Sequence, residues 1–225
     1  MTLTFSRLQA SVFILAMSTA FHLQAQRGPI PSAILPNHPV AMQLTGEQVG
    51  TESDLPVLLE AHGRLLNQAI VSASRGAYPD VMETNNEALL NNASQIANVF
   101  TAAFGPQAGK RFESLFNEHI SLGSDYINAV KTNNPVLAQQ ISSQALENGR
   151  MIANFFNQLG LRPQSSSWES MLDRHVELEA QQTKAYFLGE FNQAIDLRDQ
   201  SLAQLKIMAN ELATAIARQK PAIRP

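Results

Sequence analysis

The segment LLEAH at residues 58–62 returns twice along the chain, as LFNEH at residues 115–119 and as MLDRH at residues 171–175. The last residues of the three segments are His62, His119 and His175, which lie 57 and 56 residues apart. A fixed period of this length is typical of a repeated structural unit. The spacing therefore predicts a threefold internal repeat with one histidine at the same place in each copy.

Apolar residues recur at helical spacing through most of residues 55–218. One such stripe consists of Phe112, Leu115, Phe116, His119, Leu122, Tyr126, Ile127 and Val130. Recurrence at intervals of three and four is typical of an amphipathic α-helix. Glycine, proline and asparagine clusters follow each histidine by about 14 residues, and further breakers at 104–106 and 159–163 separate the repeats. The pattern predicts an all-α fold, in which six helices form three tandem antiparallel αα-hairpins within a helical bundle.

Two local motifs predict where helices begin. Pro135 follows two asparagines, and residues 166–169 (SSWE) have the pattern of a capping box. Proline suits the first turn of a helix, and a serine side chain can cap the exposed N–H groups there. We therefore expect helices to start at Pro135 and directly after Ser167.

The second helix of each predicted hairpin carries an amide. Residues 92–100 match residues 148–156, and residues 204–212 follow the same pattern more loosely. In an antiparallel pair, residues equidistant from the turn lie at the same height. The turn midpoints therefore place Asn92 opposite His62, Asn148 opposite His119 and Gln204 opposite His175, although Leu205 competes with Gln204 for the inward position.

Two functions fit this arrangement. In the first, the histidines are core residues hydrogen-bonded to Asn or Gln, and the protein is a structural module or binds another protein along its helical grooves. Most polar core residues have only such a structural role. In the second, the hairpins surround a pseudo-threefold axis, and the three imidazoles converge on a transition metal ion, zinc or copper. An open stack of hairpins would keep the histidines apart.

Glu179 makes the third repeat the richest in metal ligands. It follows His175 by four residues, so both side chains lie on one face of a helix. The equivalent positions in the other repeats are Leu66 and Gly123. A solvated edge or an ion pair within the helix would also explain a glutamate here. The main function hypothesis is therefore metal binding by His62, His119, His175 and Glu179, with Asn92, Asn148 and Gln204 supporting the histidines.

Catalytic sequence motifs do not support a competing function as an enzyme. The chain contains none of the common hydrolase, zinc-protease, P-loop or dinucleotide-binding motifs. The Glu-x-x-His pairs of di-iron bundles are also missing, because the acidic residues stand one or two positions before their histidines. We predict no catalytic residue and lean towards a protein that is not an enzyme.

The first 25 residues predict export. Arg7 precedes an apolar run that ends in small residues, as in a cleaved signal peptide, and the run is shorter than a membrane span. Residues 26–53 contain several prolines and glycines and predict a spacer, residues 54–219 the helical domain, and residues 220–225 a tail. We therefore expect a periplasmic or extracellular protein without a membrane span once the signal is removed.

The amino-acid composition and net charge limit the kinds of partner that the protein can bind. The net charge is −3, and it becomes −4 when Arg7 leaves with the signal peptide. A weakly acidic chain without clustered basic residues is unsuited to nucleic acid. Cysteine is absent, which excludes disulfides and thiolate metal sites. A metal ion or another protein remains as the expected partner.

The repeated LLEAH segment, together with the segments that begin at Asn92 and Asn148, resembles a family of small bacterial proteins built from tandem helical hairpins. In that family each hairpin has a histidine on its first helix and an Asn-x-x-x-Ile pattern on its second. The resemblance covers roughly residues 55–218, and the third repeat departs from it by having Gln204 in place of asparagine. It implies the hairpin fold, and it implies no activity.

Overall fold

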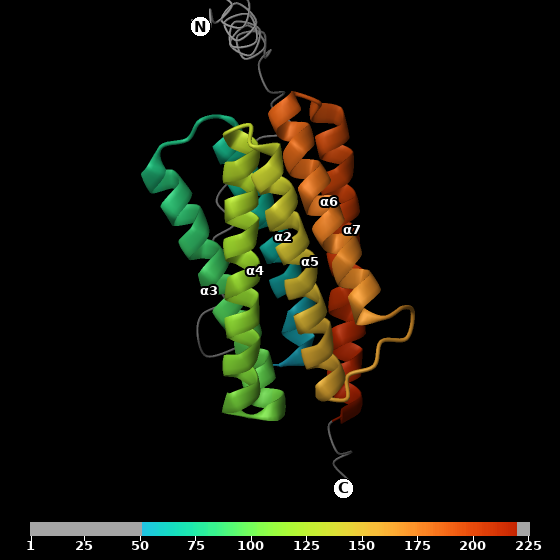
Figure 1. Ribbon diagram of the computed structural model, residues 1–225. Coiled ribbons are helices and arrows are strands. Elements are labelled where there is room, and N and C mark those ends of the chain that lie inside the picture. The colour runs from blue at the N-terminus through green and yellow to red at the C-terminus, as the bar shows by residue number, and fades with distance from the viewer. Residues whose placement is uncertain (1–50, 220–225) are drawn as a thin grey trace, which may run out of the picture.

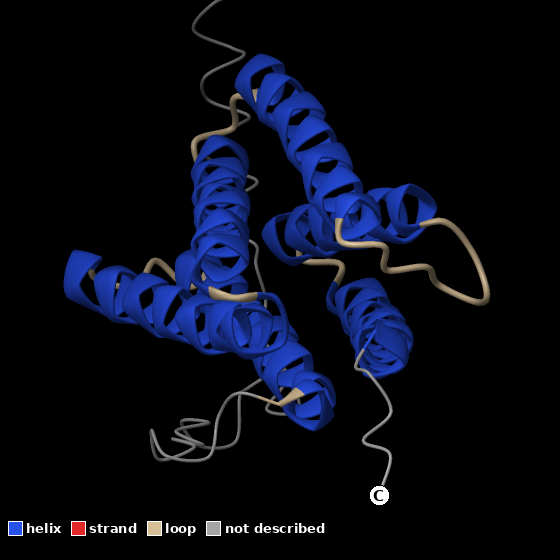
Figure 2. Ribbon diagram, turned by 90° about the horizontal axis from the view of Figure 1, so that it is seen from below, coloured by secondary structure: helices blue, strands red, loops and turns tan. Residues whose placement is uncertain are grey.

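Six α-helices make up nearly all of the protein that this computed structural model describes, residues 51–219 (Figure 1). After a short 3-10 helix, η2 (Glu52–Asp54), the helices are α2 (Leu55–Ser74), α3 (Pro79–Phe104), α4 (Pro106–Lys131), α5 (Pro135–Gln158), α6 (Trp168–Leu188) and α7 (Phe191–Gln219). Only helices and connecting loops occur within these residues (Figure 2). The predicted all-α bundle of six helices is confirmed. The predicted signal peptide, most of the spacer and the tail lie outside the described residues.

The helix boundaries follow from local sequence. Proline occupies the first turn of α2, α3, α4 and α5, where its missing N–H leaves no helical hydrogen bond unmade. Asn134 caps α5 by accepting a hydrogen bond from the Leu137 N–H at 3.1 Å, and Ser167 caps α6 by accepting one from Ser170 at 3.1 Å. The helix starts predicted at Pro135 and after Ser167 are confirmed.

The three hairpins close into a ring. Each helix packs against its neighbours in sequence, and α7 returns to pack against α2. The first helices of the three hairpins, α2, α4 and α6, also contact one another across the centre. At this contact α7 comes close to Gly63, where a Cβ would lie 2.6 Å from Leu205 Cδ1, so an alanine there would require the leucine side chain to shift. The bundle is therefore a closed threefold arrangement and not an open stack.

An aromatic core fills one half of the bundle. The ring centroids of Phe100 and Phe112 lie 4.3 Å apart, those of Phe100 and Phe156 lie 5.7 Å apart, and Trp168 meets Phe156 edge-on at 5.2 Å. Phe112 and Trp168 lie two helical turns before His119 and His175 on the same helix faces. The aromatic layer thus forms the floor beneath the level of the histidines.

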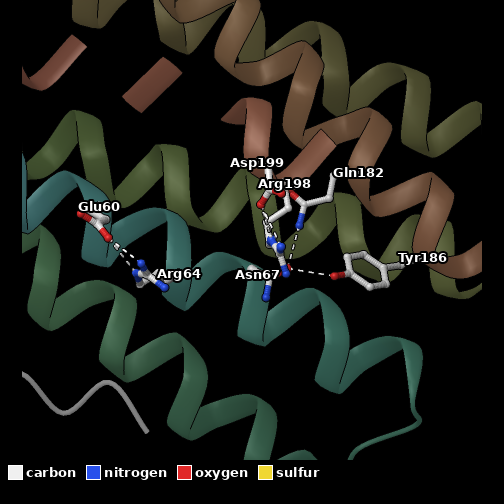
Figure 3. A network of polar contacts seen from close by, with 7 residues as sticks. All are labelled: Glu60, Arg64, Asn67, Gln182, Tyr186, Arg198 and Asp199. Atoms are coloured by element: carbon white, nitrogen blue, oxygen red, sulfur yellow. Dashed lines mark hydrogen bonds and ion pairs between the residues drawn. The ribbon is translucent and has the colours of Figure 1, made fainter. Parts of the chain in front are cut away.

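A buried polar cluster joins α2 to α6 beyond the histidines. Asn67 Oδ1 accepts hydrogen bonds from Gln182 Nε2 at 2.9 Å and from the Tyr186 hydroxyl at 3.1 Å (Figure 3). All three side chains are buried. Because an unmatched buried amide is costly, these bonds fix how far α6 slides along α2. They hold two of the three inner helices in register.

None of the helices within residues 51–219 is both long enough and apolar enough to cross a membrane.

Candidate metal centre

The three repeated histidines meet at the centre of the bundle. One ring nitrogen from each of His62, His119 and His175 lies within 4.8 Å of those of the other two. The centroids of the imidazole rings are 6.2 Å, 6.3 Å and 5.9 Å apart. The side chains come from α2, α4 and α6 and are almost completely buried, with exposed fractions of 2%, 6% and 2%. The structure thus brings together the three residues singled out by the repeat.

Glu179 completes the cluster from one side. Its Oε1 lies 2.9 Å from His175 Nε2, and its Oε2 lies 3.9 Å from His119 Nε2. The side chain is only 13% exposed, so the alternative of a solvated edge position is wrong. Despite the short contact to His175, Oε1 forms no well-aligned hydrogen bond with any described residue. The carboxylate therefore faces the imidazoles and has unused capacity to bind a cation.

Burial sets the charges of these groups. Loss of solvation lowers the pKa of His62 from 6.5 to about 3, because the attraction of Glu179 offsets it only in part. Burial likewise lowers the pKa of His119, against the opposing attraction of Glu179. Burial alone would raise the pKa of Glu179, but the attraction of His175 and the other histidines holds it at about 2. At neutral pH, His62 and His119 are thus neutral, and the carboxylate is ionised.

The amides on the second helices bind the main chain beside the histidines. Asn92 donates to the Leu58 carbonyl at 3.0 Å, Asn148 donates to the Leu115 carbonyl at 3.0 Å, and Gln204 donates to the Met171 carbonyl at 3.2 Å. Each acceptor lies four residues before a histidine, and in an α-helix that carbonyl is beside the histidine's own N–H. The predicted height of the amides is therefore correct, but their N–H groups bond to the helix backbone instead of to the imidazoles.

Besides Glu179 Oε1, five buried polar atoms of the histidines and their amides have no hydrogen-bond partner of good geometry among the described residues. They are the Nδ1 atoms of His62, His119 and His175 and the Oδ1 atoms of Asn92 and Asn148. A weak interaction with Asn148 still raises the pKa of His119, which places this carboxamide close to the ring although the alignment is poor. A ring N–H can donate a hydrogen bond and an amide oxygen can accept one. The unpartnered ring nitrogens and amide oxygens are therefore suited to pair with each other.

A pocket of about 40 Å³, counted for the centres of water-sized spheres, leads to the cluster on the Glu179 side. It reaches both His119 and Glu179, and Gly123, Ser142 and Thr183 are among its walls. Gly123 holds the position that Glu179 has in the third repeat, and a Cβ there would meet no atom within 4 Å. The sequence comparison identified Gly123 as this equivalent but did not reveal the pocket, whose walls come from three hairpins.

A comparison with protein-family models, with curated proteins and with solved structures found no match to the chain. The resemblance to bacterial tandem-hairpin proteins therefore stays a prediction.

Proposed function

We propose that the protein binds one transition metal ion, zinc or copper, through His62, His119, His175 and Glu179. The convergence of three buried imidazoles with one carboxylate carries this proposal. Neutral imidazole nitrogens and a carboxylate oxygen are ligands that both ions accept. In a metal-free protein the same arrangement buries four polar groups around one point, which is costly without a cation to bind them.

The unpartnered atoms support Nε2 as the metal-binding nitrogen. The Nε2 atoms of His119 and His175 face Glu179, whereas the Nδ1 atoms of all three rings lack partners. Histidines that bind a metal usually donate the other ring N–H to an oxygen acceptor. The free Oδ1 atoms of Asn92 and Asn148 can serve as such acceptors after a small rotation. The site therefore has both the ligands and the groups that orient them.

The size of the cluster permits binding after a modest contraction. Three nitrogens at most 4.8 Å apart surround a point at most about 2.8 Å from each, whereas zinc–nitrogen bonds are about 2.0–2.1 Å. Each imidazole would therefore move inward by at most about 0.7 Å to bind the ion.

The charge of the site also favours a divalent cation. Neutral imidazoles contribute ligands without charge, and Glu179 contributes one negative charge inside a region of low dielectric constant. With the predicted signal peptide at residues 1–25, this suggests an exported protein that stores or delivers a metal ion.

The direct test is metal analysis of the full chain, purified without a histidine tag. We expect calorimetric titration with Zn²⁺ and with Cu²⁺ to show one site per chain, and His119→Ala to abolish it. His38→Ala is the matched control, because it removes a histidine that lies outside residues 51–219. Absence of binding, or binding that survives His119→Ala, would overturn the proposal and leave a helical scaffold.

A further inference from the structure

A cavity inside the bundle lies against all three histidines. Its volume is about 30 Å³, counted for the centres of water-sized spheres, and every residue that lines it is buried. His62, His119 and His175 all contribute to its wall, but Glu179 does not. Glu179 instead lines the pocket beside Gly123. The histidines therefore separate two spaces, one with the carboxylate and one without it.

The walls of the cavity repeat with the threefold pattern. Leu59, Phe116 and Leu172 lie three residues before the three histidines, and Ile96, Ile152 and Met208 lie four residues after the three amides. Trp168 adds its indole, whose N–H is already taken by the Leu161 carbonyl at 3.0 Å. Polar atoms contribute almost none of the cavity surface, so the wall is nonpolar even where the imidazoles border it.

The size and chemistry of the cavity restrict its occupant. A bound water molecule needs two to four polar partners, and the cavity surface offers almost none. A charged ligand would lose its hydration without compensation from the nonpolar walls. The volume of about 30 Å³ is that of about two or three water-sized spheres, so only a ligand of a few atoms fits. A small uncharged gas molecule fits both requirements.

We propose that this cavity binds a small diatomic gas such as carbon monoxide or nitric oxide as a further ligand of the metal ion when that ion is copper(I), since Zn²⁺ does not bind such gases. The inference rests on the proposed metal binding. An ion held by the three histidines would have Glu179 on the side of the pocket beside Gly123. A gas molecule would approach the ion from the cavity on the other side of the histidines, where the nonpolar walls disfavour water and anions.

Xenon binding to the metal-free full chain tests the cavity itself, because xenon enters dry nonpolar cavities. Under xenon pressure we expect saturable changes in the methyl ¹³C shifts of Ile96, Ile152 and Leu172. Ile152→Phe should abolish them by filling the cavity. Ile141→Phe is the control, since Ile141 is equally buried but packs in a separate cluster. The absence of saturable shifts in the wild type would overturn the inference.

Carbon monoxide added to the copper(I)-loaded full chain tests the coordination. We expect an infrared C–O band that shifts with ¹³CO, is lost in Ile152→Phe and is kept in Ile141→Phe, while both variants retain copper. Xenon binding and copper binding without a C–O band would overturn the gas site alone. Xenon binding without any metal binding would overturn the proposed metal function and, with it, gas coordination.

Discussion

The carboxylate of Glu179 reaches back one helical turn to within 2.9 Å of His175 Nε2. This contact breaks the threefold equivalence of the histidines, because Leu66 and Gly123 hold the corresponding positions in the other hairpins. It adds one carboxylate to a set of three ring nitrogens. The repeat thus builds the cavity and the imidazoles, and one substitution in one repeat supplies the charge.

Replacing Glu179 with glutamine should weaken metal binding by at least about tenfold, because the change removes the only charged ligand from a buried site. Calorimetric titration with Zn²⁺ measures the difference. Glu177→Gln is the control: Glu177 lies on the same helix, has a 56% exposed side chain and faces Arg174 at 3.8 Å. Equal affinities of Glu179→Gln and wild type would mean that the carboxylate does not bind the ion.

His62→Leu should abolish metal binding and raise the stability of the metal-free protein. The imidazole is 2% exposed and its Nδ1 has no hydrogen-bond partner, so a leucine of similar size removes a buried polar group. A gain of about 1 kcal/mol would raise the melting temperature by about 2–4 °C in a protein of this size. A melting temperature that falls would show that His62 stabilises the fold and would favour the structural hypothesis.

Acid should destabilise the metal-free protein in two steps. Burial lowers the pKa values of His62 and His119 below the unfolded value of 6.5, so the unfolded chain binds more protons. The free energy of unfolding is highest above pH 6.5, and each group reduces it by about 1.4 kcal/mol per pH unit below that. Glu179, with its pKa lowered from 4.5 to about 2, adds a loss below pH 4.5. Denaturant titrations between about pH 7.5 and 2.5 measure both steps, and a flat profile would contradict the prediction.

Asn148→Leu should weaken metal binding by about 10–100-fold, although Asn148 does not belong to the ligand set, because the change removes the predicted acceptor for a ring N–H. It also removes the hydrogen bond to the Leu115 carbonyl. Gln204→Leu is the comparison in the third hairpin. The Gln204 amide is only partly buried, and in the wild type it donates the analogous hydrogen bond to the Met171 carbonyl. We expect a smaller effect there, and an effect of equal size would argue against orientation by Asn148.

Gly123→Leu should slow metal uptake and leave the affinity at equilibrium nearly unchanged. The added side chain would occupy the pocket that reaches His119 and Glu179 from the half-buried side of the bundle. Stopped-flow mixing with a chromophoric zinc chelator measures the rate, and Gly123→Ala serves as the mild control. An unchanged rate would mean that the ion reaches the site by another route.

Much of the fold could be predicted because it depends on periodicity. The apolar stripes and the breakers determine six helices in three hairpins, and the proline and serine motifs mark two helix starts. Convergence of the histidines could not be settled in the same way, because it depends on whether the last hairpin packs against the first. Gly63, which α7 approaches closely where the ring closes, looks in the sequence like an ordinary glycine within a helix.

The site was predictable to the level of residues but not of atoms. Equal distances from each turn place Asn92 and Asn148 at the height of His62 and His119, as observed. They do not reveal that the amide N–H groups bond to main-chain carbonyls and leave the amide oxygens free. The cavity was hidden for a related reason, since its walls combine residues from all three hairpins.

Each hairpin of the ring contributes one imidazole, and this has a consequence for biosynthesis. A chain that has folded only its first two hairpins holds two of the three nitrogens and lacks the carboxylate. The proposed ion could therefore bind tightly only after α6 is in place and α7 has docked against α2. A bound metal would then mark a chain that has finished folding, and truncated or misassembled copies would be distinguished by their lack of it.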